Sequence, residues 1–448
     1  MANPFKLEIT LKQHTPLIHF QHDQDGATLR ATEVKPKLDK FLIKNKRTEI
    51  ESSIKLTKNG IEYLDYKIKI ENHPKGHEIE IPIRSSDNKG NEINFPFVLA
   101  NMGKTETQEG FKKFVYFKGP EEEYDLKISI TCFETNLLRS IEENFNEFLF
   151  KTNFGNRQTK GFGSFLIAES DKNFDSKIYT SDFNFSIEVV NQTTNIARIK
   201  KIFEQLDLFW KALRGGINES YGSGFYFKSL IFMYAFYKMN TKWDKRKVKE
   251  KFYNSKHTTQ STKHGNPDIL ELPLRPAIIK ERMIKDLLGL SVNEKWEAEY
   301  NNSLKKVHLM NATVDINTNV IAPFLEFNQN NNHDQIDRLM SPITIKPIYM
   351  GDNIFKVFLF PNDLPSEISG TSFLFSNNTG IPFPLRFPLN TEASIHDFFD
   401  YLFLKNTIRT FNIELSAHVT QRFLTNEKFI VINRIIDEIR TNHPQNLS

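Results

Sequence analysis

FGNRQTKGFGSF, the segment from Phe154 to Phe165, combines glycines, cations and an aromatic ring in one short stretch. Glycine allows positive φ and lets the backbone come close to another group. Backbone N–H groups and cationic side chains can together hold phosphates, and a flat ring gives a base a stacking surface. The segment therefore predicts a phosphate-binding loop, and the alternative is a tight helix-to-strand turn with incidental charge. The candidate residues are Gly155, Arg157, Lys160, Gly161, Phe162 and Gly163.

Two common nucleotide-binding motifs do not fit this segment. A Walker A loop closes with Gly-Lys-Ser or Gly-Lys-Thr, whereas here Lys160 and Gly161 are followed by Phe162. A dinucleotide-binding fingerprint opens a helix directly after a strand. Here the segment follows a helical pattern and precedes a strand pattern, so neither mode of nucleotide binding is predicted.

The sequence on both sides of the loop predicts a ferredoxin-like order of elements. Apolar residues between 136 and 150 recur at helical spacing, and residues 165–168 form a short apolar strand. Upstream, residues 5–11 alternate as a half-buried strand, and Thr32 can cap a helix with apolar positions at 34, 38, 41 and 42. Further strands are predicted over 61–70, 77–83 and 124–133. The order strand, helix, strands, helix, strand is that of a ferredoxin-like unit.

A similar pattern begins again after residue 170. It predicts a strand over 183–190 and a long amphipathic helix over 196–213. The predicted class is α+β with two ferredoxin-like (RRM-like) units, residues 1–172 and 173–448, the second expanded by helices and a mobile loop near 253–274. The other predicted elements are helices over 225–237, 278–290, 394–404 and 427–440 and a hairpin formed by 341–349 and 354–360.

Composition places the chain among ordinary globular proteins. It has 448 residues, of which 39% are hydrophobic and 25% charged, which suggests two or three compact units. A single cysteine, Cys132, excludes an internal disulfide and a cysteine-based zinc site. No apolar run approaches the roughly 20 residues of a spanning helix, and the first residues enter a strand pattern without a signal-peptide core. A cytoplasmic location is therefore expected, and the net charge of +4 permits an acidic partner without requiring one.

These motifs carry a family resemblance. A helix followed by Gly155-x-Arg157-x-x-Lys160-Gly161-Phe162-Gly163-Ser164-Phe165 resembles the glycine-rich loop of the RAMP superfamily, the RNA-binding subunits of CRISPR-Cas effector complexes. The strand 5–11, then Thr15-Pro16-Leu17, then Leu29-Arg30-x-x-x-Val34-Lys35 is similar to the opening of type III RAMP subunits. Arg338-x-x-Ser341-Pro342 is similar to a further element of such proteins. The nearest resemblance is to the double-RAMP first subunit of the Cmr (type III-B) complex, although Pro36-Lys37-Leu38-Asp39 departs from the family's opening helix.

The resemblance implies a non-catalytic RNA-binding subunit without a cofactor. Such subunits hold guide RNA and its pairing with target RNA through backbone and shape contacts, alongside sister subunits, in antiviral defence. In the Cmr arrangement the first subunit lies near the 3′ end of the guide. Gly161 and Gly163 would let the backbone approach RNA, and the alternative for Arg30 and Lys35 is a solvated helix turn. The residues expected to contact phosphates are Arg30, Lys35, Lys37, Arg157 and Lys160.

The densest histidine group supports a different hypothesis. His14, His19 and His22 precede the first predicted helix, and a neutral imidazole can take a 2′-hydroxyl proton near pH 7. In this alternative the chain is a metal-independent RAMP-fold endoribonuclease that processes CRISPR repeat RNA, with His14 or His19 as the general base. No metal site is predicted, because the spacings are not the i, i+4 of a helical zinc motif. The simpler interpretation is a polar loop whose histidines contact RNA or solvent.

Two further alternatives stay open from the sequence. The run KWDKRKVKEK over 242–251 is either an RNA-facing helix with Trp243 as a stacking residue or a solvated face. A double ferredoxin-like protein could also be a protein-binding scaffold that makes no direct contact with RNA.

Overall fold

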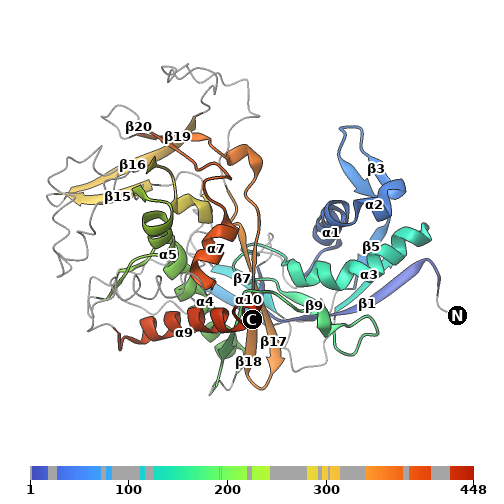
Figure 1. Ribbon diagram of the computed structural model, residues 1–448. Coiled ribbons are helices and arrows are strands. Elements are labelled where there is room, and N and C mark those ends of the chain that lie inside the picture. The colour runs from blue at the N-terminus through green and yellow to red at the C-terminus, as the bar shows by residue number, and fades with distance from the viewer. Residues whose placement is uncertain are drawn as a thin grey trace. The chain divides into compact units, whose positions relative to one another are not determined.

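The computed structural model describes the chain in segments, and these divide into two compact units. Unit 1 comprises Met1–Asp207 and Thr344–Phe360, and unit 2 comprises Leu208–Ile343 and Pro361–Ser448 (Figure 1). The division between RAMP units at residues 172 and 173 stays a prediction. The described residues are 3–18, 28–71, 77–82, 111–116, 126–190, 192, 194–218, 225–242, 280–290, 295–300, 303–312, 339–376, 383–404 and 424–447.

A four-stranded antiparallel sheet forms the centre of unit 1. Its strands are β1 (Lys6–Gln13), β5 (Lys67–Ile70), β8 (Leu126–Thr131) and β9 (Phe165–Ile167), in the spatial order β5-β8-β1-β9. Alternation places Leu7, Ile9 and Leu11 of β1 in the core, opposite Ile130, Ile128 and Leu126 of β8. Because successive strand residues point to opposite faces, the residues between them lie on the other face.

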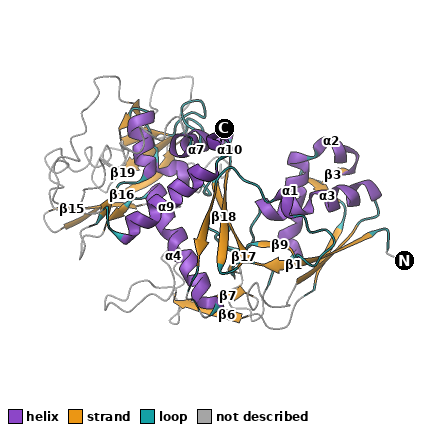
Figure 2. Cartoon of the chain, turned by 60° about the horizontal axis from the view of Figure 1, so that its bottom comes forward, coloured by secondary structure: helices purple, strands orange, loops and turns teal. Residues whose placement is uncertain are grey.

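Two helices cover the core face of this sheet. α1 (Ala31–Asn45) and α3 (Thr135–Lys151) lie on the same side of β1 in both views (Figures 1 and 2). The order strand, helix, strands, helix, strand is the one that the sequence predicts. The buried residues that the helices contribute include Val34, Leu38 and Leu42 of α1 and Ile141, Phe145 and Phe148 of α3.

The predicted cap of α1 is wrong by two residues. The helix begins at Ala31 with Arg30 as its N-cap, because the carbonyl of Arg30 accepts from the N–H groups of Glu33 and Val34 at 3.0 Å each. Thr32 therefore lies in the first turn. The Arg30 side chain is exposed at this end of the helix.

The predicted strand over 61–70 is broken into β4 (Glu62–Leu64) and β5. β5 joins the central sheet, whereas β4 pairs with β3 (Ile54–Leu56). The next predicted strand is β6 (His77–Pro82), which pairs with β7 (Phe111–Tyr116). The remaining elements here are β2 (Leu17–Ile18), paired with β7, α2 (Arg47–Ile50), η1 (Glu51–Ser53) and η3 (Ser176–Ile178).

A second sheet in unit 1 follows the order β10-β18-β17. Its strands are β10 (Asn184–Glu188), β17 (Ile343–Gly351) and β18 (Ile354–Pro361). Asp352 and Asn353 have φ of 50° and 61°, as both central residues of a type I′ hairpin turn require. The predicted hairpin is confirmed. The long predicted helix is α4 (Asn195–Arg214), and the boundary between the units falls within it.

Unit 2 contains a sheet of order β15-β16-β19-β20 and several helices. The predicted helices near 394–404 and 427–440 are confirmed as α7 (Ile395–Phe403) and α9 (Glu427–Asn442), capped by Ser394 and Asn426. The other elements are β11 (Ile217–Asn218), β12 (Tyr226–Phe227), α5 (Leu230–Met233), the π-turn η4 (Tyr234–Lys238), β13 (Thr241–Lys242), β14 (Lys280–Glu281), η8 (Lys285–Leu288), β15 (Lys295–Tyr300), β16 (Ser303–Ala312), η9 (Ser366–Ile368), β19 (Ser372–Ser376), β20 (Phe383–Arg386) and α10 (Pro444–Leu447).

Two helix predictions in unit 2 are corrected. The predicted helix over 278–290 is wrong, because 280–281 pair with β13 and the N–H of Met283 donates to the carbonyl of Arg386 at 2.9 Å. Only the short η8 turn follows. The predicted helix over 225–237 begins later, at Leu230, because Phe227 pairs with Ile217.

Helices and antiparallel sheets occur in both units, so the chain is an α+β protein. Among the described helices none is long and apolar enough to cross a membrane. The predicted loop 253–274 and all but the first residue of the run 242–251 lie outside the described residues, as does Arg338.

Candidate nucleic-acid interface

The glycine-rich segment forms a loop with a defined shape at the end of β1. It is closed where Asn153 and Ser164 form an antiparallel bridge and the N–H of Phe154 donates to the carbonyl of Gly163 at 3.0 Å. Four of its residues have positive φ: Gly155 (76°), Arg157 (56°), Gly161 (92°) and Gly163 (68°).

The segment Thr15–Ile18 holds this loop in place. The Thr15 hydroxyl donates to the Gly161 carbonyl at 2.7 Å and accepts from the Ser164 N–H at 2.9 Å. The carbonyl of Pro16 accepts from the Gly163 N–H at 2.7 Å, and that of Ile18 accepts from the Asn156 N–H at 2.9 Å. The Thr-Pro-Leu motif and the glycine-rich motif are therefore one structural unit.

The glycines serve packing within the protein. All three are buried, and a Cβ on Gly163 would lie 1.9 Å from the Phe154 carbonyl oxygen. A Cβ on Gly155 would lie 2.6 Å from the Ile18 carbonyl oxygen, and one on Gly161 would lie 2.9 Å from Pro347 Cγ. The prediction that Gly161 and Gly163 let the backbone approach RNA is wrong, because the chain itself occupies that space.

Phe162 is also part of the core. Its ring is fully buried and stacks on Phe203 with centroids 3.9 Å apart and an interplanar angle of 14°. The predicted stacking of a base on this ring is therefore wrong, since neither face of the ring is open.

Lys37 ties the loop to helix α1. Its ammonium group donates to Glu33 Oε1 at 2.9 Å, to the Asn153 carbonyl at 2.9 Å and to Gln158 Oε1 at 2.5 Å. Glu33 Oε1 also accepts from the Gly155 N–H at 2.6 Å. Burial lowers the pKa of Lys37, although Glu33 opposes this shift. Lys37 therefore orders the loop, and Glu33 is a partner that sequence analysis missed.

Lys35 makes contacts at the other side of the same helix. Its ammonium group donates to Asp39 Oδ2 at 2.8 Å and to the Leu64 carbonyl at 2.7 Å, and it lies 4.4 Å from the centre of the Tyr66 ring. The predicted alternative of a solvated turn does not hold for this residue, because its side chain stabilises the junction of α1 with β4.

Lys346 of β17 lies beneath the loop and is fully buried. It donates to the carbonyls of Thr152 and Phe165 at 2.8 and 3.0 Å, one on each side of the loop. Burial lowers the pKa of Lys346 well below its usual value, and Lys37 lowers it further. No sequence signal marks this lysine, because β17 is buried on both faces and does not alternate.

Arg157 and Lys160 lie at the two ends of the turn at the tip of the loop. The Lys160 N–H donates to the Arg157 carbonyl at 2.8 Å, and both side chains are half-buried. Lys160 also bridges to Ile345 of β17. The structure therefore brings these two predicted residues together on one rigid turn, with Glu33 and Lys37 of α1 joined to the same loop.

His14 is buried and does not suit the role of a general base. Its Nδ1 accepts from the Tyr349 N–H at 3.1 Å, so the neutral ring carries its proton on Nε2, and no described group accepts that proton. Burial lowers the pKa of His14 well below its usual value, with smaller contributions from Lys12 and Lys346. The catalytic assignment of His14 is wrong on these contacts, and His19 and His22 lie outside the described residues.

We expect His14 to make the stability of unit 1 depend on pH. The folded state keeps this imidazole neutral, whereas the unfolded chain binds a proton below about pH 6.5, so the free energy of unfolding falls by up to about 1.4 kcal/mol per pH unit below that value. In His14→Asn the amide oxygen can still accept from the Tyr349 N–H. Because the amide does not titrate, the fall in the free energy of unfolding below pH 6.5 should disappear. Chemical denaturation at pH 5.5, 6.5 and 7.5 measures the difference, and parallel profiles for the two proteins would contradict it.

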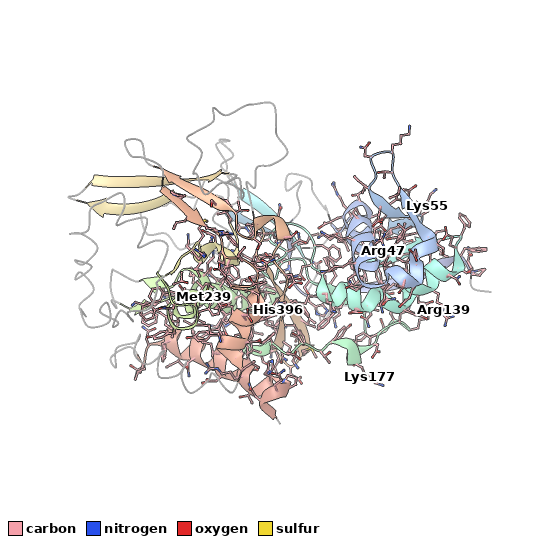
Figure 3. All side chains as sticks on the ribbon, turned by 45° about the horizontal axis from the view of Figure 1, so that its top comes forward. Arg47, Lys55, Arg139, Lys177, Met239 and His396 are labelled. Atoms are coloured by element: carbon pink, nitrogen blue, oxygen red, sulfur yellow. The ribbon has the colours of Figure 1, made fainter. Side chains whose placement is uncertain are left out.

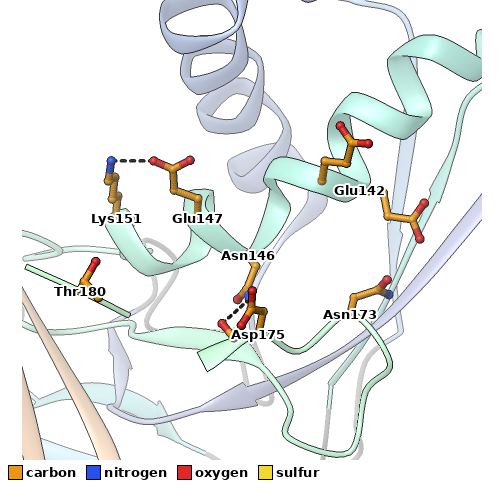
Figure 4. A pocket seen from close by; sticks show the side chains of 8 residues that line it. Glu142, Asn146, Glu147, Lys151, Asn173, Asp175 and Thr180 are labelled. Atoms are coloured by element: carbon orange, nitrogen blue, oxygen red, sulfur yellow. Dashed lines mark hydrogen bonds and ion pairs between the residues drawn. The ribbon is translucent and has the colours of Figure 1, made fainter. Parts of the chain in front are cut away.

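An acidic hollow lies between α3 and the segment 173–180 (Figure 4). Its volume is about 480 Å³. Several of its carboxylates are already paired: Glu147 with Lys151 at 2.7 Å and Glu143 with Arg139 at 2.9 Å. Arg139 lies on the surface of unit 1, as do Arg47 and Lys55 (Figure 3). A hollow of this charge repels phosphates, and no group of residues suited to a metal ion occurs within the described segments. The lining residues are Glu142, Glu143, Asn146, Glu147, Lys151, Asn173, Asp175 and Thr180.

Comparison with known families identifies the chain. A family model described as the Cmr1 N-terminal domain matches residues 4–217, and one described as the Cmr1 C-terminal domain matches residues 226–428. The chain belongs to the Cmr1 family. Membership makes it a subunit of the Cmr complex, a multisubunit type III-B CRISPR-Cas effector. No curated protein and no solved structure matches the chain. The N-terminal Cmr1 match contains the whole glycine-rich loop together with the Thr15–Ile18 segment that holds it.

Proposed function

We propose that this Cmr1-family subunit binds RNA without cleaving it and holds guide RNA, paired with target RNA, near the guide 3′ end. In this function it works with sister subunits in the cytoplasm in antiviral defence. Family membership supports the setting in the effector complex. The RNA contact is supported by the geometry of the loop.

The observation that carries the proposal is the rigid turn that bears Arg157 and Lys160. Glycine packing, Thr15, Lys37 and Lys346 hold the loop from three sides, so the turn keeps its shape without a ligand. A turn whose backbone is already ordered loses little backbone freedom on binding, and this favours phosphate contacts by the cations that it carries. Such contacts position a nucleic acid without reading its sequence, as a guide-carrying subunit requires. The exposed Arg30 lies one turn before Glu33, which contacts the loop.

We expect Arg157→Ala/Lys160→Ala to weaken binding of guide RNA by about 100-fold or more, because two hydrogen bonds to charged groups are lost and each contributes roughly 1.5–3 kcal/mol. Loss of two phosphate contacts to single-stranded RNA should also reduce the slope of log K against log salt by about 1.4. Filter binding with the full chain at several salt concentrations between 50 and 200 mM measures both quantities.

Lys40→Ala/Lys44→Ala is the matched control. Both lysines are exposed on α1 and the variant removes the same charge. An Arg157/Lys160 variant that keeps the affinity and salt slope of the control contradicts the assignment of the loop. If the wild-type chain stays bound to partner subunits after complete RNase digestion and no RNA fragment is protected, the chain is a protein-binding scaffold.

A further inference from the structure

The sheet of unit 1 has one face that the helices leave open. α1 and α3 cover the face that carries Leu7, Ile9 and Leu11. Residues that alternate with these point the other way, and the strand register aligns them in rows across the sheet. The first row contains Lys67, Thr131 and Lys6, the second contains Lys69, Ser129 and Glu8, and the third contains Glu71, Lys127 and Thr10. At the β9 edge the face is covered, because Leu166, which lies opposite Lys12, is buried.

The open face is rich in lysine. It carries Lys6, Lys12, Lys67, Lys69 and Lys127, opposed by Glu8 and Glu71.

Two of these lysines are neutralised within the protein. Lys6 pairs with Glu8 at 2.5 Å and Lys12 pairs with Glu169 at 3.6 Å. Lys6 and, more weakly, Lys127 lower the pKa of the Glu8 carboxyl, as expected for charges on the same face. Within the described part of the chain, the ammonium groups of the exposed Lys67, Lys69 and Lys127 form no hydrogen bond and no ion pair within 4 Å.

An exposed aromatic pair lies at the end of the first row. Phe133 is 81% exposed, and its ring centroid is 5.7 Å from that of Phe5, which is 37% exposed. The Cys132 N–H donates to the Phe5 carbonyl at 3.0 Å, so Phe5 and Cys132 continue the register of Lys6 with Thr131. Phe133 is the next residue and is two positions after Thr131 of the first row. The open face therefore combines unpaired ammonium groups with an exposed ring.

We propose that this open face is a second RNA-contact surface, which binds a single strand with Lys67, Lys69 and Lys127 on phosphates and a base stacked on Phe133. The inference rests on the proposed RNA-binding function and adds to it a surface separate from the glycine-rich loop. Cations that follow a backbone, together with a ring that stacks on any base, are the features of sequence-tolerant single-strand binding. A duplex hides its bases within the stack, so the exposed ring favours a single strand.

The loop and the first row of the open face, with its aromatic pair, lie at opposite ends of β1. The loop bonds to Thr15 and Pro16 just beyond its last residue, whereas Phe5 precedes its first. A strand of 8 residues spans about 26 Å, so the two surfaces can be tested separately.

The test measures binding of the full chain to a labelled, unstructured single-stranded RNA by fluorescence anisotropy at several salt concentrations. Phe133→Ala should weaken binding by about 5- to 150-fold without changing the salt slope, because a base stacked on an aromatic ring contributes affinity that does not depend on charge. Lys67→Gln/Lys69→Gln should weaken binding and reduce the slope by about 1.4. Lys40→Gln/Lys44→Gln is the matched control on the helix layer, and melting temperatures confirm that each variant is folded.

The outcomes separate this inference from the proposed function. Loss of affinity in Arg157→Ala/Lys160→Ala but not in the sheet variants overturns the second surface and leaves the loop assignment standing. Loss in the sheet variants alone supports the open face and overturns the loop. If the sheet variants bind RNA normally but capture a partner subunit more weakly, the open face is a protein interface and the inference is overturned. A wild-type chain that binds no RNA overturns both this inference and the proposed function.

Discussion

Replacement of Gly163 by alanine is expected to destabilise unit 1 by about 3–5 kcal/mol, at the upper end of single-substitution effects. The new Cβ would lie 1.9 Å from the Phe154 carbonyl oxygen and 2.7 Å from its carbon. The backbone cannot easily move aside, because the Gly163 N–H and carbonyl are bonded to Pro16 and Phe154. A φ of 68° adds the strain of a left-handed conformation for a residue with a side chain.

Gly60→Ala is the control for this prediction. Gly60 has a similar φ of 76°, but nothing lies within 4 Å of its Cβ position. This variant should lose only about 1–2 kcal/mol from conformational strain. Hydrogen exchange of the β1 and β9 amides measures the local free energy of opening in both variants. Equal losses at the two positions would show that the contact with Phe154 has no effect.

Loss of the buried Lys346 amino group is the second large effect. Lys346→Ala should destabilise unit 1 by about 3 kcal/mol or more, because the carbonyls of Thr152 and Phe165 lose a donor and a cavity remains. Lys346→Met fills most of the volume and so leaves a smaller cavity, and it should cost less. In the alanine variant the amides of the glycine-rich loop should also exchange their hydrogens faster with solvent.

The pH dependence of stability tests whether Lys346 is buried in the folded state. Burial lowers the pKa of Lys346 in the folded state, so the folded chain binds fewer protons than the unfolded chain between that pKa and about 10.5. The free energy of unfolding therefore rises with pH across this window, by up to about 1.4 kcal/mol per pH unit relative to Lys346→Met. Denaturation at pH 7, 8 and 9 measures the rise, and a constant difference between the two proteins would contradict the assignment.

Local sequence patterns predicted the elements whose packing is one-sided. β1 and α3 bury one face each, so their period of 2 or 3.6 residues is visible in the sequence. The caps at Ser394 and Asn426 are equally local. The predicted helix over 278–290 failed because strand pairing and a backbone bond to Arg386 determine the local conformation, and both partners are far away in the sequence.

The same limit applies to the candidate site: sequence patterns predict its local features but not its contacts with distant segments. The glycine-rich motif and the cations Arg157 and Lys160 are adjacent in the sequence, and they remain adjacent on one turn. Phe162 was misassigned because an aromatic beside glycines and cations has the same composition whether it faces solvent or the core. Its burial depends on Phe203 of α4, some forty residues away.

The α+β class, the order of the elements around the first sheet and the family resemblance all follow from patterns along the chain, and the Cmr1 matches confirm the resemblance. Folding, by contrast, packs the glycines against Ile18, Phe154 and Pro347 and buries His14 and Lys346. It also aligns Lys67, Lys69 and Lys127 with Phe133 on one open face. The physical reason is that periodicity and turn chemistry depend on neighbours along the chain, whereas burial and pairing depend on segments that meet only after folding.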